Sequence, residues 1–146
     1  MWACATTDAS TDVVRVDPTS LAPVRRVRVN KVFDQLRLPF AGGQLWVLGA
    51  DGASLVGIDP ATATATTRKL PVRCLQLFGS GSVLLATCRV DNVLLRIDPA
   101  SGAVNARRTI ASPGFAVMSG TDMWVDTGEG VQRLDSYLRT IAIYPT

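Results

Sequence analysis

The chain has 146 residues, of which 47% are hydrophobic and 18% are charged. That length suffices to bury a core, and no apolar run approaches the roughly 18 residues that a membrane span needs. The formal charge of +3 comes from 15 basic and 12 acidic residues without a clustered basic tract, which argues against a nucleic-acid partner.

Short runs of aliphatic and β-branched residues, separated by turn residues, follow one another along the whole chain. Such runs are typical of strands, and no segment shows helical periodicity over a useful length. We expect strands at residues 2–6, 12–17, 23–29, 33–40, 45–49, 55–59, 64–70, 74–78, 83–88, 93–98 and 104–110, and a repeat of the same pattern between 115 and 144. The Gly-Ser-Gly-Ser sequence at 79–82 is predicted to be a turn.

The clearest hairpin spans residues 93–104. In its turn, Asp98 can accept hydrogen bonds from amides two residues on, Pro99 presets φ, and Gly102 can take a left-handed conformation without strain. Leu21 and Ala63 occupy the glycine's position in two other turns, where a positive φ costs on the order of 1 kcal/mol. We therefore expect those two turns to adopt other geometries.

Two markers recur with a common period. The aspartates that begin the turns lie 42, 39 and 37 residues apart, and a large apolar residue recurs at intervals of 44, 39 and 39 residues. Two markers with one period are typical of stacked units that cannot bury their own cores. The aspartates are Asp17, Asp59, Asp98 and Asp135, and the apolar residues are Trp2, Trp46, Leu85 and Trp124.

Four-stranded units of this length predict an all-β fold, a β-propeller of four-stranded antiparallel blades. We expect one propeller segment over residues 1–146, forming a partial ring of three complete blades and one incomplete blade. The expected blades are 1–31, which lacks a strand, 32–72, 73–111 and 112–146.

Several of these segments resemble a known repeat family. The sequences at 45–47, 55–62, 94–102 and 123–125 are similar to the repeats of streptogramin-lyase-like and YVTN-type propellers. The resemblance extends over nearly the whole chain and implies the propeller fold. It implies binding of a ligand or protein more often than catalysis, because such repeats serve many functions.

The resemblance also raises the question of lyase activity, and it implies that a catalytic member would use a histidine near a divalent cation. This chain contains no histidine, so it lacks the commonest general base near neutral pH. It also lacks a Gly-rich phosphate loop and a zinc-ligand spacing. We expect a non-catalytic binding or scaffold module with no cofactor and no metal. The alternative is a fragment of a streptogramin-lyase-like enzyme whose catalytic residues lie on blades outside this chain.

In propellers of this type, the loops between the second and third strands of each blade gather at one mouth of the channel. A small polar ligand or a protein could bind there. The alternative is that solvent-facing turns use Asp and Asn to bond their own backbone, which the sequence favours. The candidate ligand-binding residues are Asp51, Arg89, Asp91, Asn92, Asp126 and Glu129, and Asp8 and Asp12 are expected at the same rim.

Arginines also recur in register. Arg26, Arg68 and Arg107 each lie nine positions after a turn aspartate, on the expected outermost strands. They could form a basic belt for an acidic partner. The alternative, which the sequence favours, is that charge on an exposed edge strand discourages pairing with other chains.

The three cysteines leave two possibilities. Cys74 and Cys88 flank the turn at 79–82 almost symmetrically, which permits a cross-strand disulfide. The odd total, with Cys4 left over, and the absence of a secretory signal favour small buried thiols. Localisation stays open, and an extracytoplasmic location is possible if the chain is part of a longer parent.

A partial ring would leave the apolar faces of its two end blades in water. Exposed patches of this kind normally mark an interface. We therefore expect the partner to be either the remaining blades of a longer, six- to eight-bladed chain or a second copy of this chain.

Overall fold

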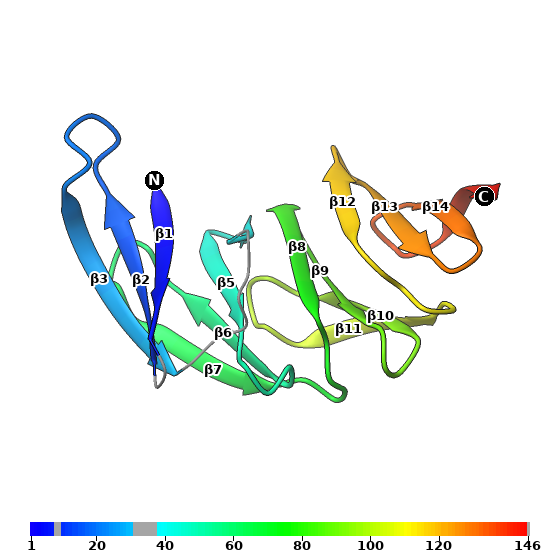
Figure 1. The fold of residues 1–146 in the computed structure, drawn as a ribbon, viewed down its shortest axis with the longest axis horizontal. Coiled ribbons are helices and arrows are strands. Elements are labelled where there is room, and N and C mark those ends of the chain that lie inside the picture. Colours follow the sequence, from blue (N-terminus) through cyan, green and yellow to red (C-terminus); the bar gives the residue numbers. More distant parts are fainter. Residues whose placement is uncertain (8–9, 31–37, 146) are drawn as a thin grey trace.

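The computed structural model describes residues 1–7, 10–30 and 38–145. The regular secondary structure in these ranges consists of β-strands alone (Figure 1). No helix that could cross a membrane occurs in this part of the chain. The first group of strands is β1 (Trp2–Thr6), β2 (Ser10–Val16) and β3 (Pro23–Asn30). The second is β4 (Phe40–Ala41), β5 (Gln44–Leu48), β6 (Ser54–Ile58) and β7 (Ala65–Lys69). The third is β8 (Gln76–Gly81), β9 (Val83–Cys88), β10 (Val93–Ile97) and β11 (Val104–Thr109). The fourth is β12 (Ala116–Ser119), β13 (Asp122–Thr127), β14 (Gly130–Leu134) and β15 (Thr140–Pro145).

Within each group, consecutive strands pair antiparallel, so each group is a simple meander. One further pairing joins two groups. β4 runs parallel to β8, with Phe40 opposite Ser80 and Ala41 opposite Gly81. The second and third groups therefore form one continuous eight-stranded sheet through their first strands.

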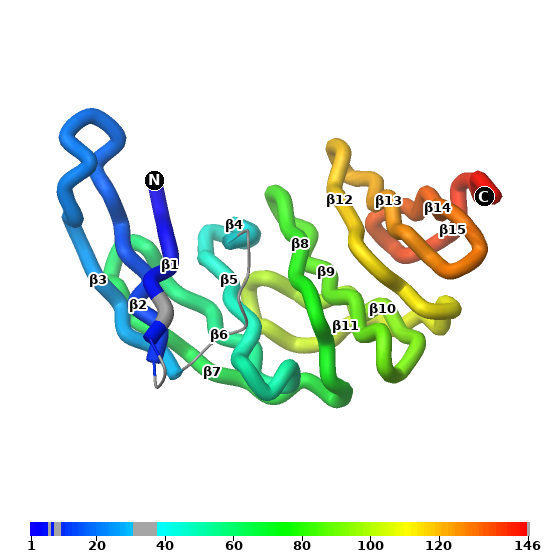
Figure 2. Tube along the Cα trace, viewed as in Figure 1, coloured from blue at the N-terminus to red at the C-terminus, as the bar shows by residue number. Residues whose placement is uncertain are grey.

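The four groups follow one another in chain order as an open array (Figures 1 and 2). The group β1–β3 lies at the left end of this view and β12–β15 at the right end, with the two chain termini on these end groups. The predicted all-β partial propeller is confirmed: three units have four strands and the first has three.

Three clusters of buried apolar side chains lie between successive groups and hold the array together. Because neighbouring residues of a strand point to opposite faces, Leu45 and Val47 of β5 pack toward β1–β3, while Trp46 and Leu48 pack toward β8–β11. A third cluster joins β8–β11 to β12–β15. Each face that adjoins another group is thus buried by that group, which is the physical reason for the repeat.

All four aspartate turns share one hydrogen-bonding scheme. The Asp98 amide donates to the Ala103 carbonyl at 2.8 Å, and the Asp98 carbonyl accepts the Gly102 amide at 2.7 Å. The same two bonds form at Asp17 and Asp59, and a version one residue shorter forms at Asp135. Each aspartate carboxylate also accepts at least one amide hydrogen bond within its turn.

The expectation that two of these turns adopt other geometries was wrong. Leu21 has a φ of 56° and Ala63 a φ of 60°, close to the 72° of Gly102. The amide hydrogen bonds to the aspartate carboxylate favour the same turn geometry and offset the cost of the positive φ. The aspartate, and not the glycine, therefore determines the turn.

The predicted turn at 79–82 is shorter than expected. β8 continues to Gly81, and Ser80 pairs with Val83, so only Gly81 and Ser82 form the turn. Gly81 has a φ of 59°, which glycine adopts without strain and which permits a two-residue hairpin. The other predicted strands agree with the observed ones to within two residues, except that residues 33–37 of the strand expected at 33–40 lie outside the described residues.

Cys74 and Cys88 form a disulfide, and Cys4 is exposed. The expectation of small buried thiols was therefore wrong. The Leu75 amide donates to the Thr87 carbonyl at 2.8 Å, which continues the pairing of β8 with β9 back to the level of the two cysteines. The odd number of cysteines carried no information about this strand pairing.

Candidate functional site

The candidate binding residues lie in the loops after β5, β9 and β13, except Asp126, which lies near the end of β13 itself. These loops join the second and third strands of their groups, and Figure 1 shows the first two at the lower edge of the array. The structure divides the six residues into two kinds: those whose side chains are bonded to the protein backbone and those whose side chains are free.

Asp51 belongs to the first kind. Its Oδ1 accepts the amides of Ala53 at 2.9 Å and Ser54 at 2.8 Å, and its Oδ2 accepts the Ser54 hydroxyl at 2.6 Å. The Ser54 hydroxyl and these amides hold the pKa of the Asp51 carboxyl below its ordinary value, because they stabilise the charged form. Its backbone carbonyl also accepts Nε of Arg73 at 3.0 Å. Asp51 therefore builds its loop.

Asn92 has a similar structural role in the next loop. Its Oδ1 accepts the Ser112 amide at 2.8 Å, and its carbonyl accepts the Ile110 amide at 2.9 Å. Its φ of 54° is one that Asn tolerates better than most residues. Asn92 therefore fastens the β9–β10 loop to the loop that leads into β12.

The other four candidates belong to the second kind. They are exposed, and among the described residues their side chains form no hydrogen bond or ion pair. Asp91, Asp126 and Glu129 are acidic, and Arg89 adds one positive charge. These four residues are Arg89, Asp91, Asp126 and Glu129.

The side chains of this rim do not converge on one point. In the described ranges, no three His, Cys, Asp or Glu side chains gather closely enough to hold a metal ion. Sites on the rim are spread over separate loops, an arrangement suited to a ligand with several separated groups or to a protein surface.

One hollow of about 340 Å³ adjoins the rim beside Asp51. Sequence reasoning missed two of its polar lining residues, Asn30 at the end of β3 and Thr67 on β7. No local pattern marks them, because the hollow forms only where the edge strands of the first two groups approach each other. Its lining residues are Asn30, Gly49, Ala50, Asp51, Ser54, Val56 and Thr67.

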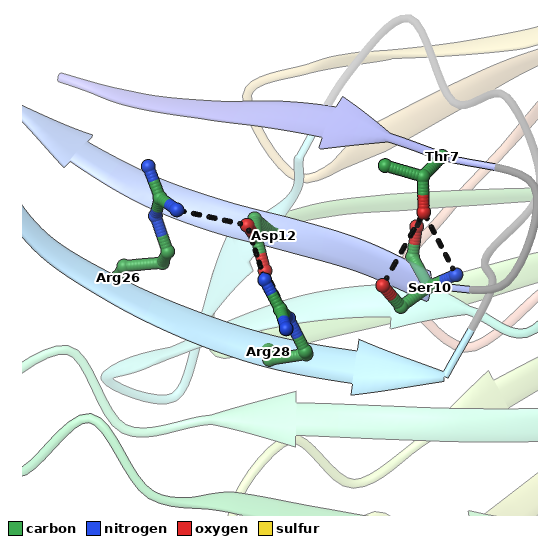
Figure 3. Close-up of polar contacts among 5 residues, drawn as sticks. All are labelled: Thr7, Ser10, Asp12, Arg26 and Arg28. Atoms are coloured by element: carbon green, nitrogen blue, oxygen red, sulfur yellow. Dashed lines mark hydrogen bonds and ion pairs between the residues drawn. The ribbon is translucent and has the colours of Figure 1, made fainter.

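Asp12, which was expected at the rim, lies within β2 and is used in an ion-pair cluster (Figure 3). Its carboxylate accepts Nε of Arg28 at 2.8 Å and lies 3.3 Å from Nη1 of Arg26. The hydrogen bond from Arg28 lowers the pKa of Asp12 most, and the charges of Arg28 and Arg26 lower it further. Asp8 lies outside the described residues. Figure 3 also shows the Thr7 hydroxyl, which donates to the Ser10 carbonyl at 3.1 Å.

The three recurring arginines lie on β3, β7 and β11, each of which is an edge strand. Arg26 is paired with Asp12, and Arg68 packs against the turn at Gly102. Their placement agrees with protection of exposed edges. No acidic partner is needed to explain it.

Comparison with known proteins identifies the fold. No protein-family model matches the chain, and no curated protein matches it. Among solved structures, BamB from Moraxella catarrhalis is similar over 97% of this chain and 49% of its own, with a TM-score of 0.65 and 14% identity. BBS1N, solved in complex with ARL6DN, is similar over 94% of this chain and 45% of its own, with a TM-score of 0.74 and 15% identity. The N-terminal domain of Nup159 gives a TM-score of 0.67 at 14% identity over 98% of this chain and 41% of its own.

These neighbours are β-propellers, so the comparison supports the fold without confirming the streptogramin-lyase-like or YVTN-type family. The chain spans about half the length of the structures it resembles, as a partial propeller should.

Proposed function

We propose that this partial propeller is a non-catalytic binding or scaffold module that engages a small polar ligand or a protein through the loops after β5, β9 and β13. A general binding or scaffold role agrees with the propeller neighbours, one of which was solved with a protein partner. The remaining blades of a longer chain or a second copy of this chain would complete the ring.

The observation that carries the proposal is that some rim side chains are bonded within the protein while others are not. Asp51 and Asn92 hold the loops in place through backbone hydrogen bonds. Asp91 lies in the loop that Asn92 fastens, Asp126 lies near the end of β13, and Glu129 lies in the β13–β14 loop, where its amide donates to Oγ1 of Thr127 at 3.3 Å. The side chains of these three residues have no partner among the described residues. Free carboxylates on fixed loops cost little to order on binding, which favours recognition of a cationic group.

The proposal is tested by following backbone amide chemical shifts during titration with a tetralysine peptide. We expect saturable shifts at residues 89–92 and 126–129 and none at the four aspartate turns, whose carboxylates are already bonded. The double variant Asp126→Asn/Glu129→Gln should weaken binding by roughly tenfold or more. Shifts that appear equally at the aspartate turns, or that survive in the double variant, would contradict the proposal.

A further inference from the structure

Each internal interface of this chain joins two different faces. We call the face of a group that contacts the following group its leading face, and the opposite face its trailing face. On β4–β7, Trp46 and Leu55 belong to the leading face, and Leu45 and Val56 belong to the trailing face. Every internal interface pairs a leading face with a trailing face, so the two end groups present one face of each kind.

The leading face of β12–β15 is the first of these. Trp124 is paired with Val117 on β12 and Arg133 on β14, so these side chains share a face. On the trailing face of the same group, Met123, Val125 and Leu134 are fully buried against β8–β11. The opposite face is open: Val117 and Tyr144 are each 48% exposed.

The corresponding positions of the internal groups are buried. Trp124 occupies the position of Trp46, which is 2% exposed. Val117 occupies the position of Phe78, because Phe78 pairs with Leu85 as Val117 pairs with Trp124, and Phe78 is 7% exposed. The leading face of β12–β15 therefore has the residue pattern of a face that packs against another blade, but no other described strand group covers it.

Inside the chain, arginines on leading faces donate hydrogen bonds to the aspartate turn of the following group. Arg96, on the leading face of β8–β11, donates through Nε to the Ser136 carbonyl at 2.8 Å, in the aspartate turn of the next group. Its guanidinium lies 5.3 Å from the centre of the Tyr137 ring, a cation–π contact. Arg25 reaches the Ala61 carbonyl, in another aspartate turn, in the same way.

Arg133 occupies the position of Arg96, because Arg133 pairs directly with Trp124 on β13 as Arg96 pairs directly with Leu85 on β9. Its guanidinium instead remains on its own sheet. Nε donates to Oδ2 of Asp122 at 2.9 Å, and the group lies 5.5 Å from the Trp124 ring centre. Trp124 also stacks on Tyr144 with a centroid distance of 5.5 Å.

The trailing face of β1–β3 provides the two features that leading faces contact inside the chain: apolar side chains and an aspartate turn. Ala3, Val14 and Arg26 share that face by register, and Val14 corresponds to the buried Val56. The Asp17 turn has the same two backbone hydrogen bonds as the Asp59 turn, whose Ala61 carbonyl accepts Arg25 inside the chain.

Charge complements this match. The trailing face carries Asp12, Arg26 and Arg28, an excess of one positive charge. The leading face carries Asp122, Asp126 and Arg133, an excess of one negative charge. Opposite net charges favour pairing of these two faces over pairing of either face with itself.

We propose that the leading face of β12–β15 docks onto the trailing face of β1–β3 of a second copy of this chain. Two such head-to-tail contacts close a ring from two copies, because each copy spans about half of a propeller such as BamB. The inference deepens the proposed function, in which a second copy or further blades complete the ring, and the docking face shares Asp126 with the rim.

Three matched valine variants test it by sedimentation equilibrium. Val117→Lys charges the leading face, Val14→Lys charges the trailing face, and Val90→Lys charges a residue that is 78% exposed in the β9–β10 loop. We expect the unmodified chain to sediment as twice its 15.5 kDa mass. The first two variants should raise the dimer dissociation constant by roughly tenfold or more, and Val90→Lys should leave it unchanged.

A mixing experiment distinguishes head-to-tail pairing from self-pairing of one face. Equal amounts of Val117→Lys and Val14→Lys chains retain one intact interface, so the mixture should dimerise more tightly than either variant alone. Arg133→Ala, on a partly exposed side chain, gives a second leading-face variant should Val117→Lys fail to fold.

Two results would overturn the inference. A monomer at every concentration would show that a second copy does not cover this face. A dimer that Val117→Lys weakens and Val14→Lys leaves intact would show that β12–β15 pairs with itself. Neither result bears on tetralysine binding by the rim loops.

Discussion

The indole of Trp46 fills the space above the α-carbon of Gly57, its partner on the neighbouring strand. A Cβ at Gly57 would lie 2.8 Å from Cζ3 of Trp46 and 2.5 Å from Oε1 of Gln44. The indole NH also donates to the Ala41 carbonyl at 3.1 Å, which fixes the ring in this place.

Gly57→Ala is therefore expected to lower the free energy of unfolding by about 1 to 3 kcal/mol, the usual cost of overpacking a core. Urea unfolding followed by tryptophan fluorescence measures the loss. Gly128→Ala is the matched control, because its added Cβ would meet only Ser112 at 4.0 Å and its backbone is not left-handed. Equal effects of the two substitutions would show that the Trp46 contact is not responsible.

Opposite substitutions at the equivalent position of two aspartate turns should change the free energy of unfolding by different amounts. Gly102→Ala should cost about 1 to 2 kcal/mol, since alanine is strained at a φ of 72° and its Cβ would lie 2.7 Å from Cδ of Arg68. Leu21→Gly should change stability by less than about 1 kcal/mol, because relief of strain is offset by the greater freedom of glycine in the unfolded chain. Chemical denaturation of the two variants side by side checks this, and a larger loss in Leu21→Gly would contradict it.

The disulfide predicts a loss of stability when it is removed. Cys74→Ala/Cys88→Ala should lower the free energy of unfolding by about 3 kcal/mol, the value for closing a loop of this separation of 14 residues. A reducing agent should have a similar effect on the unmodified chain and none on the double variant. Cys4→Ser is the control. Thiol titration of the native chain that counts three reactive groups after denaturation would refute the bridge.

The turn aspartates predict a loss of stability in acid. Hydrogen bonds hold the pKa values of the four turn aspartates below their ordinary values: chiefly from backbone amides at Asp17, Asp59 and Asp135, and chiefly from the Ser101 hydroxyl at Asp98. The unfolded chain, with aspartate pKa values of about 3.9, then binds more protons than the folded chain. This contribution is complete above about pH 4 and is lost as the pH falls through the lower folded values.

We therefore expect the urea midpoint to be level near neutral pH and to fall steadily in acid. Asp98→Asn keeps the Oδ1 acceptor and loses the titrating group, so its midpoint should depend less on pH than that of the unmodified chain. A midpoint that stays constant well below pH 4 would argue that these carboxylates contribute nothing through their charge.

The strand order could be predicted because its determinants are local. Asp98 and the residues after it carry the turn within a few positions, and the same pattern recurs at Asp17 and Asp59. The geometry at Leu21 and Ala63 could not be predicted from the turn glycine alone, because the deciding interactions are hydrogen bonds to the aspartate. The bond from Arg96 to Ser136 joins residues 40 positions apart and has no local signal.

The candidate site was predictable only as a set of loops. Residue type did not separate Asp51, which is bonded to its own loop, from Asp126, which is free. A signal was nevertheless present: Ser54 follows Asp51 by three positions, as Ser101 follows Asp98. In both pairs the serine hydroxyl donates to the aspartate at 2.6 Å. Aspartate followed by serine at this spacing therefore marks a turn-building carboxylate in this chain.

The short parallel pairing of β4 with β8 has a consequence for how the array opens. The Cys74 amide, just before β8, donates to the Gly52 carbonyl in the β5–β6 loop at 2.7 Å and adds a further link at the other end of the same junction. The eight central strands should therefore exchange their amide protons with solvent as one cooperative unit. The groups β1–β3 and β12–β15, attached by side-chain packing without shared backbone ladders, should open independently and exchange first.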